Sequence, residues 1–322
     1  MRIAILGAAG MLGRKLVDRL AAERTLAGEP ITGFVLHDIV TPSAPIGDYE
    51  IELLSSDFSA EGEAAKIVAL WPDVIFHLAA VVSGEAEADL AKGYRVNLDG
   101  TQALLEAIRA VGSGYRPRFV FTSSLAVFGA PLPDVIPDDF VLRPLSSYGA
   151  QKAIGELLVA DYSRRGIIDG ISIRLPTICV RPGRPNKAAS SFYSGIIREP
   201  LNGEEAILPV SLDIRHWFAS PRAAIGYLVR AAEVASDKLT VRSLTMPGVS
   251  ATVADEIEAL RKVGGDDAVK LIREQPDPAI HAIVSTWPKA FDARSALELG
   301  FVADQSFEEI VEIYQRDELG KA

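Results

Sequence analysis

The sequence predicts an α/β protein in which a doubly wound parallel sheet is followed by a smaller, discontinuous C-terminal α/β domain. Three observations support this fold class. Short apolar runs alternate with Ala- and Leu-rich helical stretches over the first half of the chain, a glycine-rich turn follows the first run, and this rhythm is lost beyond Pro176. Strands that alternate with helices form right-handed βαβ units, which build a parallel sheet.

The individual elements follow from the apolar periodicity of the first half. We expect strands at Arg2–Leu6, Gly33–His37, Val74–Leu78, Phe119–Thr122 and Ile171–Arg174. We expect helices at Met11–Glu23, Glu61–Leu70, Asp89–Ala110 and Ser147–Arg165. Runs such as Val74–Leu78 (VIFHL) are almost entirely apolar, which suits a sheet that helices cover on both faces.

The chain beyond residue 178 is expected to be less regular. Arg181–Lys187 (RPGRPNK) is a loop rich in Pro and Gly, and Pro-rich turns recur in the last third of the chain. The pattern predicts a first domain over residues 1–178, with a return segment near 210–245. A second domain is expected to take most of residues 179–322.

Composition and charge exclude several classes of protein. Of 322 residues, 48% are hydrophobic and 24% are charged, as in globular proteins, and the formal net charge is −10. An acidic chain without a long basic run is unsuited to binding nucleic acid. The apolar stretch Val74–Val82 is too short to cross a bilayer, no signal peptide is visible, and the single Cys179 excludes an internal disulfide. We expect a cytoplasmic protein with neither nucleic-acid nor membrane partners.

A glycine-rich turn connects the first expected strand to the first expected helix. In the segment GAAGMLG, Gly7 permits a tight turn, Gly10 lets the backbone approach a pyrophosphate, and Gly13 lets the helix pack on the sheet. The following helix begins with Met11 and Leu12, and its N-terminus offers unpaired N–H groups to phosphate oxygens. This arrangement at the first βα turn is typical of a Rossmann-type dinucleotide site.

Two acidic residues are candidates for the adenosine end of such a site. Asp38 ends the second strand, where its carboxylate would accept hydrogen bonds from a ribose; the alternative is a solvated loop residue. Its distance from the glycine turn exceeds the usual ~20 residues, which an insertion near Thr25–Thr32 explains. No arginine follows Asp38 to hold a 2′-phosphate, so NAD is expected rather than NADP. Asp57 is expected to contact adenine or to cap the following helix.

A Tyr-x-x-x-Lys pair and a serine are the catalytic candidates. Tyr148 and Lys152 lie one helical turn apart, so the ammonium would sit near the phenol. A free phenol has a pKa of about 10; a neighbouring cation lowers it, which makes Tyr148 a general base usable near neutral pH. Ser124 follows the strand Phe119–Thr122 at the carboxyl edge of the sheet, and would orient a substrate oxygen. One of Ser123 and Ser124 is expected to serve only local structure.

Other polar residues are candidates for substrate binding or for support of the site. An acidic protein that binds an anion must concentrate positive charge locally. Arg184, Arg215 or a serine near residue 190 could hold the substrate carboxylate, although Arg184 could instead brace its loop and Arg215 could form a buried structural ion pair. Ser83 either hydrogen-bonds a substrate hydroxyl or belongs to a turn, and Asn97 either fills a helix surface or anchors backbone or water near Lys152. The four histidines lack metal-ligand spacing, so no metal is expected.

Together, these motifs resemble the extended short-chain dehydrogenase/reductase family of NAD-dependent epimerases and dehydratases. The resemblance rests on GAAGMLG, HLAA, Asn97, FTSSLAVFG, the Tyr148/Lys152 pair and RLPT, and it covers residues 1 to about 180. It continues weakly in the segment FDARSALELGF. Each motif alone is weak, whereas the combination is highly specific.

The resemblance implies NAD as cofactor and a homodimer that uses the helices near residues 89–110 and 147–165. Within it, the glycines bind pyrophosphate, Asp38 binds ribose, and Lys152 binds the nicotinamide ribose. The residues assigned to the cofactor are Gly7, Gly10, Met11, Leu12, Gly13, Asp38, Asp57, Leu78, Ala79, Ala80, Asn97, Tyr148, Lys152, Pro176, Thr177 and Ile178.

Within the family, four segments are most similar to dehydrogenases of four-carbon sugar acids: HLAAVVSGEAEADL, YGAQKAIGELLVADYSRRG, RLPTICVRPGRPNKAASSF and SGIIREPL. This implies NAD-dependent oxidation of the C2 hydroxyl of D-erythronate to a 2-keto acid, with Tyr148 as base and Ser124 at the developing carbonyl. Two alternatives are a nucleotide-sugar epimerase or dehydratase and a non-catalytic NAD-binding sensor. Arg215 falls where nucleotide-sugar members hold a diphosphate, but Arg222 replaces their common Asp; the intact Tyr148 and Lys152 argue against a sensor.

Overall fold

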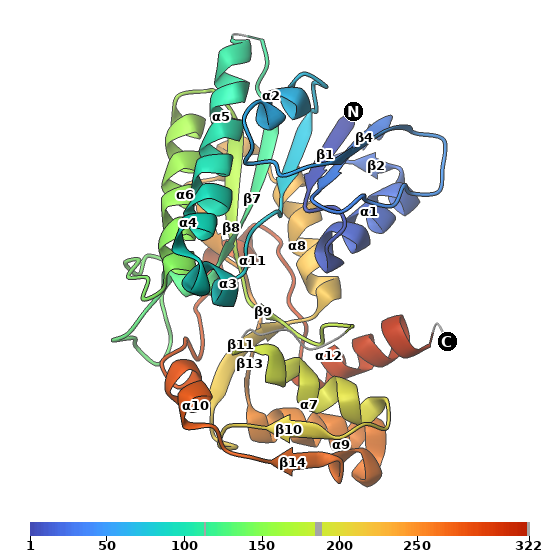
Figure 1. The fold of residues 1–322 in the computed structure, drawn as a ribbon, viewed down its shortest axis with the longest axis vertical. Coiled ribbons are helices and arrows are strands. Elements are labelled where there is room, and N and C mark those ends of the chain that lie inside the picture. The colour runs from blue at the N-terminus through green and yellow to red at the C-terminus, as the bar shows by residue number, and fades with distance from the viewer. Residues whose placement is uncertain (113, 184–188, 321–322) are drawn as a thin grey trace. The chain divides into compact units, whose positions relative to one another are not determined.

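A computed structural model describes residues 1–112, 114–183 and 189–320 of the chain (Figure 1). The chain divides into two compact units, each assembled from segments that are separated in sequence. Unit 1 comprises Met1–Val127, Pro144–Arg174 and Ile225–Leu244, and unit 2 comprises Phe128–Arg143, Leu175–Ala224 and Thr245–Ala322.

Unit 1 is built on a seven-stranded sheet with the order β12-β8-β7-β6-β1-β4-β5. The strands are β1 (Arg2–Leu6), β4 (Gly33–Asp38), β5 (Glu50–Ser55), β6 (Val74–His77), β7 (Arg118–Ser124), β8 (Asp169–Leu175) and β12 (Ser243–Thr245). Strand β1 pairs in parallel with both β4 and β6, and the β4–β5 and β6–β7 pairs are also parallel. The strand order reverses at β1, so the sheet is doubly wound and the predicted Rossmann-type fold class is confirmed.

Helices cover this sheet on both faces (Figure 1). Ala4 and Leu6 of β1 belong to a core that includes Leu104 and Leu105, whereas the alternating Ile3 points to the other face and is equally buried. Burial on both faces explains why the central strands are apolar throughout. The main helices are α1 (Met11–Glu23), α2 (Glu63–Val68), α5 (Gly100–Val111), α6 (Ser147–Arg164) and α8 (Pro221–Glu233).

The long helix expected at Asp89–Ala110 is confirmed to within one residue at each end, with a π-helical turn inside it. Asp89 caps the N-terminus of this helix, because its side chain accepts a hydrogen bond from the backbone N–H of Lys92 at 3.0 Å. A π-helical turn then brings Asn97 into the interior. The observed elements are α3 (Ser83–Ala88), α4 (Leu90–Tyr94), the π turn (Arg95–Asp99) and α5.

The other expected strands and helices of unit 1 are confirmed to within two residues at each end. Sequence analysis expects a third strand just before Asp57 without giving its bounds and does not predict β12; β5 and β12 form the two edges of the sheet. Strand β5 contains no fully buried residue and β12 has only three residues, so neither shows the apolar run that marks a central strand. The 3-10 turns of this unit are Leu125–Val127 and Ser236–Lys238.

Unit 2 combines two small sheets with helices around a separate core. That core includes Tyr193, Ile196, Phe218, Leu260 and Ile310. Strands β9 (Thr177–Ile178), β11 (Arg215–Ala219) and β13 (Val249–Thr252) form one sheet, and β10 (Ala206–Leu208) pairs with β14 (Ile272–Glu274). The helices are α7 (Ser191–Leu201), α9 (Val253–Val269), α10 (Pro278–Val284), α11 (Arg294–Glu298) and α12 (Phe307–Tyr314), followed by a π turn (Gln315–Leu319).

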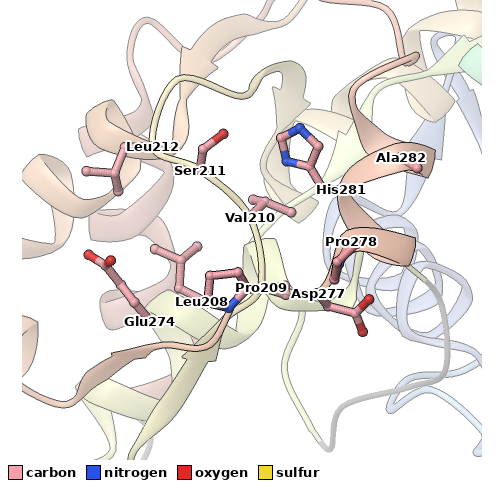
Figure 2. Close-up of a pocket in the computed structure, with 11 residues that line it drawn as sticks. Leu208, Pro209, Val210, Ser211, Leu212, Glu274, Asp277, Pro278, His281 and Ala282 are labelled. Atoms are coloured by element: carbon pink, nitrogen blue, oxygen red, sulfur yellow. The ribbon is translucent and has the colours of Figure 1, made fainter.

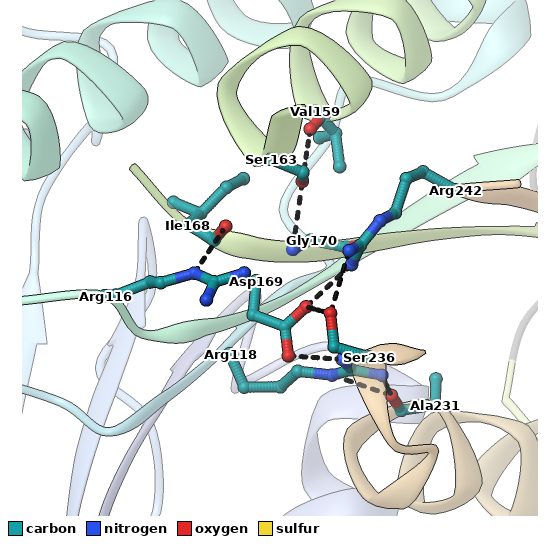
Figure 3. A network of polar contacts seen from close by, with 10 residues as sticks. All are labelled: Arg116, Arg118, Val159, Ser163, Ile168, Asp169, Gly170, Ala231, Ser236 and Arg242. Carbon is teal, nitrogen blue, oxygen red and sulfur yellow. Dashed lines mark hydrogen bonds and ion pairs between the residues drawn. The ribbon is translucent and has the colours of Figure 1, made fainter. Parts of the chain in front are cut away.

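An ion-pair network in unit 1 joins the first residues of β7 and β8 to the segment before β12 (Figure 3). Asp169 accepts hydrogen bonds from Arg118 (2.8 Å), Arg242 (2.6 Å) and Ser236 (2.7 Å). Arg118 is buried and also donates to the carbonyl of Ala231. Partial burial raises the pKa of Asp169, but the hydrogen bonds from Ser236 and Arg242 and the charge of Arg118 outweigh it and hold the pKa below its ordinary value.

Asp169→Ala is expected to lower the free energy of unfolding by about 2–3 kcal/mol, because it leaves the buried Arg118 without its counter-charge. Chemical denaturation followed by circular dichroism measures this change. Asp161→Ala is the matched control: it removes only the exposed pair with Arg164 and should change the free energy by less than about 1 kcal/mol. Equal effects of the two substitutions would contradict the role assigned to the network.

Candidate active site

The glycine turn between β1 and α1 has no room for side chains at two positions. Gly7 has a φ of +91°, and a Cβ there would lie 2.8 Å from the backbone nitrogen of Ala79. A Cβ on Gly13 would lie 2.1 Å from the carbonyl oxygen of Gly7. Gly10 caps α1 without a side-chain hydrogen bond, and no acidic residue occupies the first turn. The exposed backbone N–H groups at this end of α1 therefore fit a pyrophosphate.

Asp38 stands at the end of β4 and is half-buried. One carboxylate oxygen accepts a hydrogen bond from the backbone N–H of Ala9 (2.9 Å), and the other accepts one from Ile39 (2.7 Å). These bonds hold the carboxylate beside the glycine turn, where a ribose-binding residue has to lie. The expected insertion is a hairpin of β2 (Thr25–Leu26) and β3 (Glu29–Pro30), which accounts for the long spacing to Asp38.

Asn97 anchors the backbone that follows β6. Its Oδ1 accepts from the N–H of Val81 (2.8 Å), and its Nδ2 donates to the carbonyl of Val81 (3.0 Å) and to Gln151 (2.7 Å). Asn97 is 2% exposed, so it does not fill a helix surface. Through Gln151 it also contacts the helix that carries Lys152. The half-buried residues of the anchored segment are Leu78, Ala79 and Ala80.

Asp57 follows β5, as expected for a residue near the adenine end of a dinucleotide site. Its carboxylate forms an ion pair with Arg95 at 2.5 Å and accepts the backbone N–H of Ser59 at 3.0 Å. Partial burial raises its pKa, but the hydrogen bonds from Ser59 and Arg95 outweigh burial and lower it. The other predicted residues of this unit are half-buried: Met11 and Leu12 in the first turn of α1, and Ser83 at the start of α3.

Tyr148 and Lys152 lie one turn apart on α6, and their side chains are close to each other. The Lys152 Nζ lies 5.7 Å from the centroid of the Tyr148 ring and 4.7 Å from that of Phe121, and donates to the carbonyl of Thr122 at 2.8 Å. Lys152 is only 2% exposed. Burial lowers the pKa of its ammonium to about 7, against the opposing negative charge of Glu156.

Glu156 forms hydrogen bonds with buried polar side chains of strands β7 and β8. It accepts hydrogen bonds from Ser123 and from both Nε (2.9 Å) and Nη2 (2.7 Å) of Arg174. Ser123 is buried, so it is the serine that serves local structure. Ser124 is half-buried, and its Oγ accepts the backbone N–H of Ala126 at 3.2 Å.

Sequence analysis missed three groups that hold Lys152 and its surroundings in place. Glu156 lies four residues after Lys152, and this spacing could have signalled its position on the same helix face. The carbonyl of Thr122 leaves no trace in the sequence, because a backbone acceptor does not depend on the side chain. Gln151 points to Asn97, 54 residues away in sequence, and only the fold brings the two together.

The predicted residues of unit 2 begin at the edge of its three-stranded sheet. Pro176 and Ile178 are buried and Thr177 is half-buried. Strand β9 pairs in parallel with β11, and the hydroxyl of Thr177 lies 2.7 Å from Nε2 of His216. The other ring nitrogen of His216 lies 3.0 Å from the carbonyl of Pro288. Sequence analysis gave His216 no role.

Arg215 is one of the two arginines that are candidates for binding the substrate carboxylate. Arg215 begins β11, and its side chain is 42% exposed. Its guanidinium lies 3.2 Å from the carbonyl of Ser250 and 3.8 Å from the carboxylate of Asp255, so the ion pair is long and largely solvated. Arg184 lies outside the described residues.

An open groove of about 610 Å³ lies between α10 and the segment that follows β10 (Figure 2). None of the predicted site residues that the structure describes lines it. Over the described ranges, no group of three His, Cys, Asp or Glu side chains could hold a metal, and no helix is long and apolar enough to cross a membrane. The groove is lined by Leu208, Pro209, Val210, Ser211, Leu212, Glu274, Pro276, Asp277, Pro278, His281 and Ala282.

Residues 3–220 match the NAD dependent epimerase/dehydratase family. The chain belongs to this family; NAD is its cofactor, and it is an oxidoreductase.

Two curated relatives are D-erythronate dehydrogenases. That of Cupriavidus necator is 47% identical over 98% of each chain, and that of Haemophilus influenzae is 41% identical over 97% of this chain and 98% of its own. The crystal structure of a nucleoside-diphosphate-sugar epimerase from Agrobacterium tumefaciens is 57% identical, with a TM-score of 0.98 over 100% of this chain and 95% of that one. An L-threonine dehydrogenase from Cupriavidus necator is 25% identical, with a TM-score of 0.84 over 98% and 99%.

The buried Lys152 leads to a prediction on the pH dependence of stability. Its pKa is about 7 in the folded chain and 10.5 in an unfolded one, so between these values the unfolded state binds more protons and stability rises with pH. Lys152→Met removes this dependence. The melting temperature of the variant should exceed that of the parent protein most below pH 7, and the difference should shrink towards pH 9. A difference that is constant with pH would contradict the shifted pKa.

Proposed function

We propose that this protein oxidises the C2 hydroxyl of D-erythronate to a 2-keto acid with NAD. The observation that carries the proposal is the buried Lys152 ammonium, 5.7 Å from the Tyr148 ring, beside the carboxyl end of β7. The names of the two curated relatives support the substrate. We further propose that unit 1 is the NAD-binding domain and unit 2 the substrate domain.

The residues of unit 1 fit NAD, because the crowded glycine turn exposes backbone N–H groups and Asp38 stands beside it. We assign the pyrophosphate to the N-terminus of α1, the adenosine ribose to Asp38 and the adenine to the neighbourhood of Asp57. Lys152 would bind the nicotinamide ribose. When bound, NAD supplies the acceptor for the hydride that leaves the substrate carbon.

The chain's own groups handle the proton and the oxygen of the substrate. The Tyr148 phenolate takes the proton of the C2 hydroxyl as general base. The positive charge of Lys152 favours the phenolate over the phenol, and its contacts with Thr122 and Phe121 keep it in place. Ser124, at the end of β7, donates a hydrogen bond to the oxygen that becomes the carbonyl.

A nucleotide-sugar epimerase is the second candidate, favoured by the name of the Agrobacterium tumefaciens relative that is 57% identical. Arg215 would then hold the diphosphate. Arg222, where an Asp is common in nucleotide-sugar enzymes, forms an ion pair with Asp317 at 2.5 Å. The replacement of that Asp by a paired Arg222 supports the sugar acid over the nucleotide sugar. A non-catalytic NAD sensor is the third candidate, and the intact Tyr148–Lys152 pair weighs against it.

We also propose that the protein is a cytoplasmic homodimer of carbohydrate metabolism. The support for a dimer is the family resemblance, which implies an interface formed by the helices observed here as α5 and α6; Leu157 of α6 is 66% exposed. Light scattering on the purified protein tests the oligomeric state, and a monomer at micromolar concentration would reject this part of the proposal.

Tyr148→Phe is expected to lower kcat for D-erythronate by at least about 10³-fold while NAD still binds, because the general base is lost. Absorbance at 340 nm with NAD⁺ measures oxidation of the sugar acid, and chromatography of the products measures conversion of UDP-sugars, because an epimerase regenerates its NAD⁺. Tyr162 lies on the same helix as Tyr148, and its hydroxyl donates to Glu106 of α5, so Tyr162→Phe should retain turnover. Near-normal activity of Tyr148→Phe would remove Tyr148 from the mechanism; conversion of a UDP-sugar without oxidation of any sugar acid would favour the epimerase.

Arg215→Met is expected to raise KM for D-erythronate about tenfold or more, because it removes an exposed positive charge that can pair with the substrate carboxylate. Arg184→Met is measured in the same assay. Arg222→Met breaks the ion pair with Asp317 and serves as the matched control, with KM unchanged. Unchanged KM values for both Arg184→Met and Arg215→Met would show that neither arginine binds the carboxylate.

A further inference from the structure

A short chain of hydrogen bonds in unit 2 ends on a predicted ligand-binding residue. The hydroxyl of Thr177 lies 2.7 Å from Nε2 of His216, and Nδ1 of His216 lies 3.0 Å from the carbonyl oxygen of Pro288. His216 is 3% exposed, whereas Thr177 is half-buried. These hydrogen bonds therefore connect the buried His216 to the hydroxyl of a residue that is partly accessible.

The chemistry of the three groups determines which one donates at each step. A carbonyl oxygen only accepts, so Nδ1 of His216 carries the proton that bonds to Pro288. In a neutral imidazole the other nitrogen then has no proton and is an acceptor. Thr177 has to donate its single hydroxyl proton to Nε2. Its oxygen is left with lone pairs alone for any further partner.

Aromatic neighbours hold the His216 ring in this orientation and keep it neutral. The Tyr193 ring stacks on it, with centroids 5.5 Å apart and an interplanar angle of 9°, and the rings of Phe218 and Trp287 lie at 5.3 and 5.2 Å. Burial lowers the pKa of His216 to about 4, although the hydrogen bond to Pro288 opposes this shift. The imidazole is thus uncharged at neutral pH.

We infer that His216 is a positioning residue that makes the hydroxyl oxygen of Thr177 a hydrogen-bond acceptor for an N–H or O–H group of a bound ligand. The identity of that ligand rests on the proposed function. Two sources supply such a donor: the carboxamide NH₂ of the nicotinamide and a hydroxyl of the sugar acid. The same geometry excludes the substrate carboxylate from this position, because a carboxylate brings no proton and would face the oxygen lone pairs.

The reverse polarity would leave a buried group without a partner. If Thr177 donated its proton to the ligand, Nε2 of His216 would be an acceptor without a donor among the described residues. A buried polar atom that loses its partner is costly. The structure therefore favours an acceptor role for Thr177 over a donor role.

The first test determines which nitrogen of His216 carries the proton, and it requires neither a ligand nor turnover. Long-range ¹H–¹⁵N spectra of histidine-labelled protein contain only four imidazoles, and His216→Phe assigns the relevant one. We expect protonated Nδ1 and unprotonated Nε2 at pH 7. Protonated Nε2 would overturn the inference, because Thr177 would then be free to donate.

The second test identifies the donor on the ligand. Thr177→Val removes the acceptor and is expected to weaken binding of the relevant ligand about tenfold, and Thr177→Ser should restore it. If the carboxamide is the donor, the parent protein binds NAD more tightly than its 3-acetylpyridine analogue, and Thr177→Val abolishes this preference. If a sugar hydroxyl is the donor, the variant instead loses the preference for D-erythronate over its deoxy analogues. An unchanged preference in both arms would overturn the inference.

His216→Phe keeps the ring stack on Tyr193 but removes both nitrogens. It is expected to weaken the same ligand by a similar factor, and the double variant with Thr177→Val should be no weaker than either single one. His281→Phe, a half-buried histidine at the open groove, is the matched control and should bind normally. Additive losses would overturn the positioning role. The spectra and the NAD affinities are measured without sugar acid, so failure to oxidise D-erythronate would reject the proposed function alone.

Discussion

The arrangement of unit 1 depends on burying one ammonium group next to a phenol. Lys152 is almost fully enclosed, and an enclosed cation requires compensation from neighbouring groups. The carbonyl of Thr122 accepts one of its protons, the Phe121 ring lies against it, and the charge of Glu156 opposes the fall in its pKa. Glu156 in turn requires Arg174 and Ser123. The burial of Lys152 is thereby linked to side chains at the ends of β7 and β8 and along α6.

The relatives of this chain carry names for different reactions, and the fold cannot choose between them. A dehydrogenase and a nucleotide-sugar epimerase both need the glycine turn, the acidic residue after β4 and the Tyr–Lys pair, all of which belong to unit 1. In our proposals, the groups that distinguish the substrate belong to unit 2: the polarity of Thr177, the partly solvated Arg215 and the replacement of a common Asp by Arg222. Variants of unit 2 are therefore the ones that test the choice of substrate.

The local pattern of apolar residues predicted the central strands of unit 1, because every residue along these strands is buried or nearly so. It failed where burial is partial. The edge strand β5 exposes most of its residues and does not show an apolar run. The helix expected at Asp89–Ala110 is present, but its composition is helical throughout and gave no sign of the π turn at Arg95–Asp99.

The sequence by itself determined the cofactor class and pointed to the proposed catalytic pair, because Gly7, Gly13, Tyr148 and Lys152 are related by spacing within one turn or one helix. Only the tertiary structure decided which serine is structural, what Asn97 holds and how His216 orients Thr177. Each of those roles is a contact between segments far apart in the chain, such as Asn97 with Gln151 or His216 with Pro288. Hydrogen bonds depend on distance and direction in space, and these are set only when the chain has folded.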